Sequence, residues 1–199
     1  GKQEHKVYRI DLKKSTPPNV PQLGQVVARH TYLKELNLLD DFDKYTLGKA
    51  IKAFHTADHL QYDPSLRNQI AAGIIDRFEV GEMVEVDALA QIGQKWREYV
   101  DFRFPAKRIL RKYPIRHYHN EQLFETIIDL LIETEKGWVV IQNTSYAGSD
   151  KNLDKKAGEL SSWFFLVQEA LGKIFGSQSI ETYVHFVLSA NCYQLQLEK

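Results

Sequence analysis

The stretch RILRKYPIRHYHNEQLFETIIDLLIETEKGWVVIQNTS, residues 108–145, decides the fold class of this chain. It contains three segments rich in Ile, Leu, Val and aromatic residues, which we predict to be β-strands at residues 108–115, 122–133 and 137–145. The second and third segments are joined at residues 133–137, which is a hairpin-like length. The stretch therefore predicts a run of neighbouring strands in the second half of the chain.

Helical periodicity dominates the chain before this stretch. From Tyr45 onward, apolar residues recur at helical spacing: Leu47, Ala50, Ile51 and Phe54. Asp63 and Pro64 form a cap and first-turn pair that opens a second helix. Its expected inward residues are Leu66, Ile70, Ile74 and Phe78. We expect a third helix over residues 82–99.

After the strands, a long amphipathic helix is expected. Its apolar residues are Leu153, Ala157, Leu160, Phe164, Val167 and Leu171. Gly172 is its expected C-terminal end. Residues 181–188 and 192–197 are expected closing strands, and residues 5–12 an N-terminal strand. Pro17, Pro18 and Pro21 then form a stiff connector.

These elements predict an α/β (α+β) fold with a mixed central sheet flanked by helices. We interpret residues 1–199 as one domain, with an N-terminal strand and connector (1–44), a helical segment (45–105) and an α/β core (106–199). A fragment of a longer protein is compatible with this organisation.

The composition is that of an ordinary globular domain. Hydrophobic residues make up 43% and charged residues 26%, with 26 Lys plus Arg against 26 Asp plus Glu. Nucleic-acid binding therefore requires a local basic patch. The single cysteine, Cys192, excludes an internal disulfide and suits a reducing compartment. Without a run of about 20 apolar residues, we expect no membrane contact and a cytoplasmic location.

Several catalytic motifs are absent. No Walker A sequence occurs, so this chain has no nucleotide-hydrolysing motor, and no G-x-S-x-G motif occurs. His55 and His59 are four residues apart, a spacing that can hold zinc, although a polar helix face is the expected reading. His117 and His119 alternate on a strand and are expected at the surface.

Two stretches resemble the C-terminal nuclease domain of RecB/AddA-type helicase–nucleases, within the UvrD/Rep-like helicases. They are LGKAIKAFHTADH (47–59) and RKYPIRHYHNEQLFETIIDLLIETEKGWVVIQNTSYAG (111–148). The helix AGELSSWFFLVQEALG (157–172) follows, and VHFVLSANCYQLQLE resembles the closing strand pair. The resemblance spans residues 47–198 and implies a restriction-endonuclease-like core of the PD-(D/E)xK superfamily.

The chemistry of that family needs an Asp on one strand and an (Asp/Glu)-x-Lys arm on the next. The carboxylates hold Mg²⁺ or Mn²⁺ against the scissile phosphate, and the lysine orients or activates water. At the matching positions this chain keeps Asp129 but has Gln142 for the second carboxylate and Thr144 for the lysine. We therefore expect Asp129 to lie beside these two residues.

Four further positions depart from the family pattern. Lys52 replaces the histidine of the first helix, and Lys112 replaces the early glutamate. Glu159 and Trp163 replace the Gln and Tyr of the later helix. The resemblance implies a degenerate site in which Asp129 pairs with Lys52 or Lys112. We expect Lys52 to approach the cluster from the first helix.

Relocated acids are the alternative that preserves an active exonuclease. Glu125 shares a strand face with Asp129 but is about 13 Å away at ~3.3 Å per residue. Asp150 and Asp154 follow the altered arm and are better placed. None of them restores the lysine. We therefore expect no cofactor in this domain, with Mg²⁺ bound only if the nuclease site is active.

Three functions follow from this reading. The first is a catalytically inactive nuclease-like domain of a DNA repair or recombination helicase, which binds DNA or docks a partner. The expected partners are DNA and the helicase motor domains of the parent chain, an ATP-dependent DNA helicase, or a partner subunit. The second is the active exonuclease, and the third is a purely structural or protein-interaction module.

A local basic segment motivates DNA binding. Five cations occur within ten residues, beside Tyr113 and Tyr118: Lys107, Arg108, Arg111, Lys112 and Arg116. Lysine and arginine neutralise phosphates, and aromatic rings stack on unpaired bases. An edge strand that carries cations against aggregation is the alternative explanation.

Overall fold

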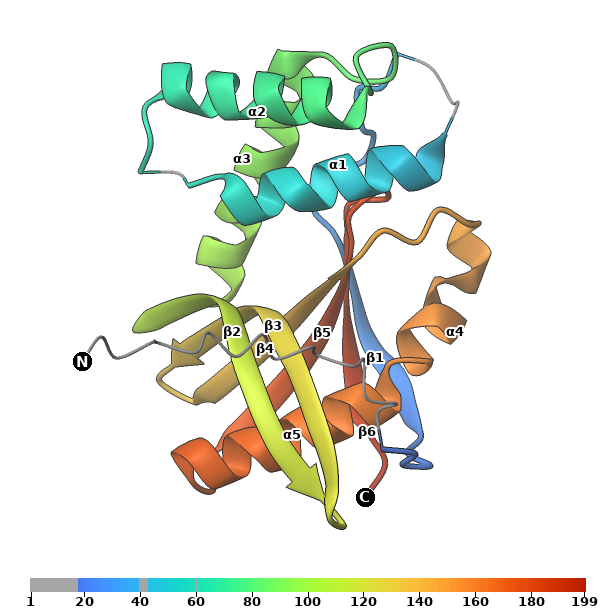
Figure 1. Cartoon of the computed structure of the whole chain (residues 1–199), viewed down its shortest axis with the longest axis vertical. Coiled ribbons are helices and arrows are strands. Elements are labelled where there is room, and N and C mark those ends of the chain that lie inside the picture. The colour runs from blue at the N-terminus through green and yellow to red at the C-terminus, as the bar shows by residue number, and fades with distance from the viewer. Residues whose placement is uncertain (1–17, 40–42, 60) are drawn as a thin grey trace, which may run out of the picture.

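The computed structural model describes residues 18–39, 43–59 and 61–199 of the chain. The fold is mixed α/β, with helices around one sheet (Figure 1). The elements, in chain order, are β1 (Gly24–Thr31), α1 (Lys44–Ala57), α2 (Pro64–Phe78), α3 (Val86–Arg103), β2 (Arg108–His119), β3 (Gln122–Thr134), β4 (Gly137–Thr144), a 3₁₀ turn (Asp150–Asn152), α4 (Leu153–Gly158), α5 (Ser161–Phe175), β5 (Ser179–Phe186) and β6 (Asn191–Leu197).

The sheet has six strands in the order β1-β6-β5-β4-β3-β2. Strands β2, β3 and β4 form an antiparallel meander, as residues 108–145 predict. Helices α4 and α5 then carry the chain back, so that β5 pairs parallel to β4, and β6 returns antiparallel to β5. A parallel pair requires such a helical connection. The expected mixed sheet flanked by helices is confirmed.

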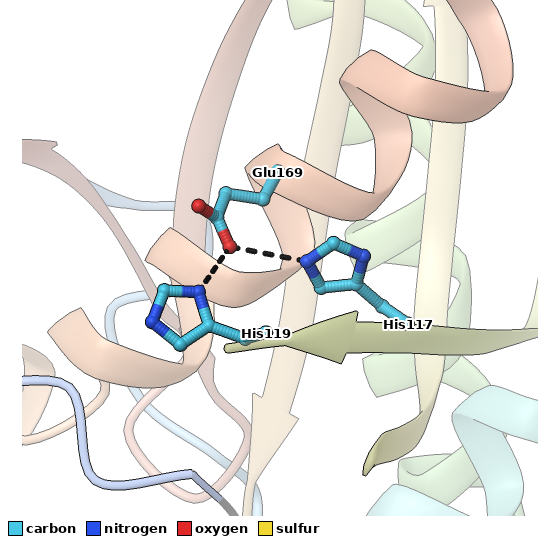
Figure 2. Close-up of side chains that lie close together, drawn as sticks. All are labelled: His117, His119 and Glu169. Atoms are coloured by element: carbon cyan, nitrogen blue, oxygen red, sulfur yellow. Dashed lines mark hydrogen bonds and ion pairs between the residues drawn. The ribbon is translucent and has the colours of Figure 1, made fainter. Parts of the chain in front are cut away.

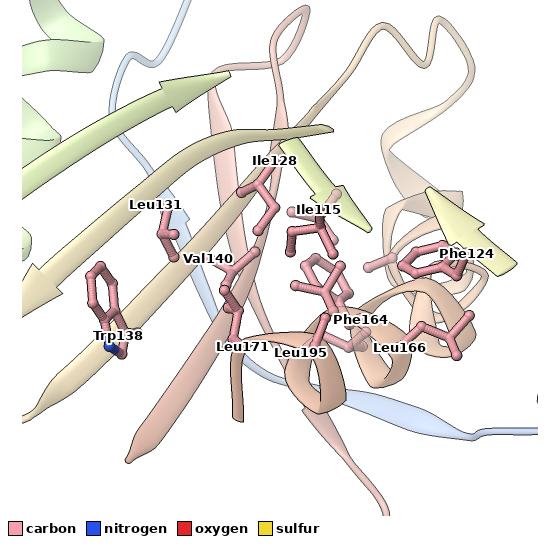
Figure 3. Packing of buried hydrophobic residues seen from close by; sticks show 14 of the residues in the cluster. Ile115, Phe124, Ile128, Leu131, Trp138, Val140, Phe164, Leu166, Leu171 and Leu195 are labelled. Atoms are coloured by element: carbon pink, nitrogen blue, oxygen red, sulfur yellow. The ribbon is translucent and has the colours of Figure 1, made fainter. Parts of the chain in front are cut away.

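One face of the sheet packs against α5. Trp138 and Val140 of β4 contact the buried face of α5, which includes Phe164, Val167 and Leu171 (Figure 3). The two sheet residues are two apart, so strand alternation places both on this face. This cluster forms the largest part of the core.

The other face of the sheet packs against the C-terminal half of α3. Trp96, Val100 and Phe104 contact a second set of strand residues, which includes Val139 and Ile141 of β4. Both faces of β4 are therefore buried, and its central residues are continuously apolar, as expected of a fully covered strand.

Helices α1, α2 and α3 gather at one end of the sheet (Figure 1) and share a third apolar cluster. The predicted cap of α2 is confirmed, because the Asp63 carboxylate accepts a hydrogen bond from the Leu66 backbone N–H at 2.9 Å. Of the residues expected inside α2, Ile74 is buried and Ile70 and Phe78 are partly buried. Leu66 is 38% exposed, so its predicted burial is wrong.

The single long helix predicted after β4 is wrong, because the structure divides it into α4 and α5. The Ser161 hydroxyl donates to the Gly158 carbonyl at 2.5 Å, and such local bonds compete with helix continuation. Gly172 is not the end of α5, which continues to Phe175 and is capped by Gly176 at φ 82°. A left-handed residue in that place suits glycine.

Strand β1 is absent from the sequence-based prediction. It pairs with β6 at the edge of the sheet, between Gly24↔Leu197 and Thr31↔Asn191. The strand predicted at residues 5–12 lies outside the described residues, as does Pro17.

Candidate functional site

The expected site lies where β3 and β4 separate. Their pairing extends only to Leu130↔Ile141, and Asp129, the residue before Leu130 in the chain, is not part of this ladder. From there the Gln142 side chain replaces the missing backbone bonds. Its Oε1 accepts from the Asp129 N–H at 3.0 Å, and its Nε2 donates to the Ile127 carbonyl at 3.3 Å. Gln142 therefore bridges the diverging strands, a bonding role for which an amide has both donor and acceptor.

The Asp129 carboxylate is fully engaged. Lys112 lies beside it on β2, where the β2–β3 register skips one pair, and Lys112 Nζ is 2.5 Å from Asp129 Oδ1. The other oxygen accepts from the Asn143 N–H at 2.9 Å. The Asp129 side chain is 4% exposed and that of Lys112 is 42% exposed. An ammonium group therefore pairs with this carboxylate.

Lys112 itself has an unusual backbone conformation, with φ at 49°. This left-handed conformation is costly for a residue with a side chain, by about 1 kcal/mol. It interrupts the regular alternation of β2 beside Asp129, between the pairs Arg111↔Leu130 and Tyr113↔Ile128.

The expected cluster of Asp129, Gln142, Thr144 and Lys52 forms only in part. Asp129 and Lys112 line a small cavity of about 20 Å³ on the α3 side of the sheet. Gln142 and Thr144 instead line a larger pocket of about 490 Å³ beside α5. Among the described residues, no hydrogen bond or ion pair joins the Lys52 side chain to Asp129, so the lysine at this carboxylate is Lys112.

Cations surround the small cavity. Its lining includes Arg97, Arg111 and Lys112 against the one carboxylate of Asp129. Burial lowers the pKa of Arg97 to about 10, with a further contribution from the nearby charge of Arg111. A volume near 20 Å³ has room for about one water molecule, whereas Mg²⁺ usually keeps several waters. The cavity is unsuited to a hydrated divalent cation in both charge and size.

One buried histidine, His55, lines this cavity, and a second, His185, lies against it. The sequence pattern does not pair these two residues. The rings of His55 and His185 are 5.0 Å apart between centroids, and His185 stacks on Trp96 at 3.5 Å. Burial, together with the charge of Arg97, lowers the pKa of His55 to about 3. Burial also lowers the pKa of His185 well below its ordinary value, helped by His55 and Arg97. Both imidazoles are therefore neutral at pH 7.

The two rings differ in their hydrogen bonds. His185 Nε2 is 2.7 Å from the Tyr32 hydroxyl, and its Nδ1 is 2.8 Å from Asn143 Oδ1. Neither nitrogen of His55 has a hydrogen-bond partner among the described residues. His55 and His59 do not share a helix face, because α1 ends at Ala57 and His59 lies beyond it. The expected polar helix face is likewise wrong at His55, which is 3% exposed.

The larger pocket unites four of the seven predicted site residues: Gln142, Thr144, Glu159 and Trp163. Glu159 pairs with Lys156 at 3.1 Å, and Trp163 Nε1 donates to the Thr126 hydroxyl at 2.9 Å. The aromatic rings of Tyr45, Tyr146 and Phe186 complete much of the wall. With one acid and one base that pair together, this pocket can accept a small neutral or aromatic group more readily than a metal ion.

The candidate replacement acids do not approach Asp129. Glu125 forms an ion pair with Arg116 at 3.0 Å. Asp154 pairs bidentately with Arg29. Asp150 lines a different cavity, beside Leu153 and Ser189.

The cations of the local basic segment, residues 107–116, all contact acids or backbone carbonyls. Lys107 pairs with Glu135 at 3.1 Å, Arg108 with Glu133 at 3.1 Å, and Arg116 with Glu125 at 3.0 Å. Arg111 is half-buried and donates to the Asp58 carbonyl at 2.7 Å. These contacts, with that of Lys112, occupy all five predicted DNA-binding cations. The side chains of Arg108 and Arg116 remain 52% and 68% exposed.

His117 and His119 were expected at the surface, and for His117 this is wrong. His117 is 5% exposed, because it lies on the face of β2 that α5 covers. Both imidazoles turn toward Glu169 of α5, as Figure 2 shows. The alternation of the two histidines predicts a shared face, but the acid 50 residues away is not visible in the sequence pattern.

None of the helices that the structure describes combines the length and hydrophobicity needed to span a bilayer. No protein-family model matches the chain, and a search of curated proteins returns no significant match.

Proposed function

We propose that this chain is a nuclease-like domain that does not cleave DNA, part of a cytoplasmic helicase–nuclease of DNA repair or recombination. The observation that carries the proposal is the ion pair between Lys112 and Asp129, at the point where β3 and β4 diverge. The family's chemistry needs a divalent cation there. Here an ammonium group occupies the carboxylate instead.

The arrangement of elements supports the nuclease-like assignment. The resemblance implies a helix, a strand meander, a helix and a closing strand pair, and these elements occur in that order. Gly48 of the Leu-Gly pair brings α1 against the end of β4, since a Cβ there would be 3.0 Å from the Ser145 carbonyl oxygen. Asp129 lines one cavity, whereas Gln142 and Thr144 line another, which departs from the family pattern. The three residues therefore lack a shared position for a metal ion.

A cleavage assay tests the proposal. Purified protein is incubated with labelled single-stranded and double-stranded DNA in Mg²⁺ or Mn²⁺. We expect no degradation above that of the Asp129→Ala variant, because Gln142 and Thr144 supply neither a carboxylate nor a lysine. Metal-dependent cleavage that Asp129→Ala abolishes would overturn the proposal and favour an active exonuclease.

Restoring the motif tests why the activity is missing. The double variant Gln142→Asp with Thr144→Lys supplies the missing groups but leaves Lys112 on Asp129. We expect it to remain inactive, and we expect any Mg²⁺ binding to require Lys112→Glu in addition. Activity in the double variant alone would show that the ammonium group does not block the site.

DNA contact through β2 is the function that we propose for the non-cleaving domain. Arg116 and Tyr118 share the outer face of the strand, and Tyr118 is 59% exposed. Exposed ion pairs contribute only about 0–1 kcal/mol, so DNA phosphates can compete for these arginines. Since each arginine already has an acidic partner, the binding should be weak.

Salt titration of fluorescent single-stranded DNA tests this contact. Affinity should fall steeply with salt, as phosphate contacts require. Arg108→Glu with Arg116→Glu should abolish binding, whereas Lys95→Glu, the same reversal on α3, should not. No binding at low salt, or equal effects of these variants, would exclude DNA contact through β2 and leave partner docking as the function.

A further inference from the structure

His117, His119 and Glu169 form a cluster on the α5 side of the sheet, outside the site described above. His117 Nε2 and His119 Nδ1 are 3.1 Å and 2.8 Å from the same carboxylate oxygen of Glu169 (Figure 2). The three donor atoms all lie within 4.8 Å of one another. Two elements far apart in the chain supply them, β2 and α5.

Two of these three spacings are close to those of a metal centre. With Zn–N and Zn–O bonds of about 2.0–2.2 Å, the donors of one tetrahedral zinc ion lie roughly 3.3 Å apart. The His117–Glu169 and His119–Glu169 pairs therefore need to open by only a few tenths of an ångström. Both imidazole nitrogens contact the same Glu169 oxygen, so the three side chains already converge.

The surroundings hold the ligands while leaving access to solvent. The side chains of His117, His119 and Glu169 are 4%, 20% and 34% exposed. The Phe165 ring packs against His119 in an edge-to-face arrangement, and Asn120 Nδ2 lies 3.3 Å from the outer nitrogen of that imidazole. Zinc on His119 Nδ1 places the ring proton on Nε2, so the Asn120 amide must turn and accept that proton through its oxygen, in the way that metal-binding histidines are oriented elsewhere.

We infer that His117, His119 and Glu169 bind one Zn²⁺ ion per chain, with the fourth position open to water. Two imidazoles and one carboxylate match zinc and its transition-metal neighbours, whereas Mg²⁺ and Ca²⁺ prefer oxygen donors. The ion links β2 to α5. This inference is independent of the proposed DNA-related function.

Metal titration of the full chain tests it. Protein stripped with a chelator and dialysed is titrated with ZnCl₂ by calorimetry, and with CoCl₂ by visible absorption. We expect one equivalent to bind, and Mg²⁺ to bind at least about 100-fold more weakly because the site offers it only one carboxylate. Affinity should fall as the pH is lowered, because protons compete for the imidazole nitrogens.

Matched variants locate the site. Glu169→Gln and His119→Gln should each weaken zinc binding by about 100-fold or more, since even removal of an outer hydrogen bond costs 10–100-fold. The same changes at Glu159→Gln and His59→Gln should leave it unaltered. His117 is buried, so His117→Gln is compared only after circular dichroism confirms its fold.

Two results would overturn the inference. The first is failure of the stripped, folded protein to bind Zn²⁺ or Co²⁺ at micromolar concentration. The second is one equivalent of zinc that binds equally well to wild type, Glu169→Gln and His119→Gln.

Discussion

Two regions of this molecule each combine two histidines with one carboxylate, and they differ in the partner of the carboxylate. On the α3 side, Asp129 pairs with the ammonium group of Lys112, near the buried rings of His55 and His185. On the α5 side, Glu169 pairs with His117 and His119 themselves. The two regions contain similar groups, but they therefore differ in their suitability for a metal ion.

The difference shows that suitability for a metal ion depends on the local charge more than on position in the fold. At Asp129 the ammonium group of Lys112 pairs with the carboxylate, and buried Arg97 adds a further positive charge. At Glu169 the partners are imidazoles, which are neutral ligands when unprotonated and can exchange a proton for a metal ion. Metal binding, and the activation of a metal-bound water, is therefore disfavoured beside Asp129 and compatible with the groups around Glu169.

The largest expected effect concerns acid stability and comes from the buried histidines. The folded-state pKa of His55, about 3, lies far below the ordinary value of 6.5, so the unfolded chain binds more protons below pH 6.5. Stability should therefore be unaffected by His55 at pH 7 and should decrease as the pH falls. The loss approaches about 1.4 kcal/mol per pH unit for each such histidine.

The variant His55→Phe should remove its share of this slope between about pH 6 and pH 4. Urea unfolding at pH 7, 5.5 and 4.5 measures it. His59→Gln is the control, because that imidazole is partly exposed and should change the slope less. An unchanged slope in His55→Phe would show that His55 is protonated or hydrated in the folded protein.

The next effect concerns the ion pair at Asp129. Asp129→Asn leaves Lys112 without its counter-ion and weakens the acceptor of the Asn143 N–H. Since hydrogen bonds to charged groups contribute about 1.5–3 kcal/mol, we expect a loss of about 2 kcal/mol at pH 7. Glu125→Gln, which breaks the more exposed pair with Arg116, should cost under about 1 kcal/mol. Equal losses in these two variants would contradict the special role of the Lys112 pair.

Much of the fold could be predicted from the sequence because its signals are local. Apolar runs at β3 and β4, helical spacing in α1, and the Asp63 cap each depend on residues within a few positions. Strand β1 was missed, because an edge strand with one half-covered face has a weaker pattern. The break between α4 and α5 was missed because a Ser161 bond to Gly158 overrides a continuous apolar stripe.

The sites depend on residues that are distant in the chain, and prediction was weaker there. The resemblance predicted the proximity of Asp129 to Gln142, but the choice of Lys112 over Lys52 depends on register and on a left-handed residue. The pairing of His119 with Glu169 joins positions 50 residues apart through the packing of α5 on β2. A sequence pattern places two histidines on one face but does not identify what lies opposite.

The smallest effect separates the charge of Glu169 from its packing. Burial alone would raise the pKa of Glu169, but hydrogen bonds from His117 and His119 outweigh it and hold the pKa below its ordinary value. A carboxylate with a depressed pKa stabilises the fold above its unfolded pKa, and that stabilisation is lost as the pH falls through the folded-state pKa.

With a chelator present, Glu169→Gln should therefore cost up to about 1 kcal/mol at pH 7. The cost should be smaller at pH 3 than at pH 7, because pH 3 lies below the ordinary pKa of 4.5, as measured by urea unfolding. An equal cost at both pH values would mean that the Glu169 side chain acts through packing alone. The two regions would then differ only in that Asp129 has Lys112 as its partner.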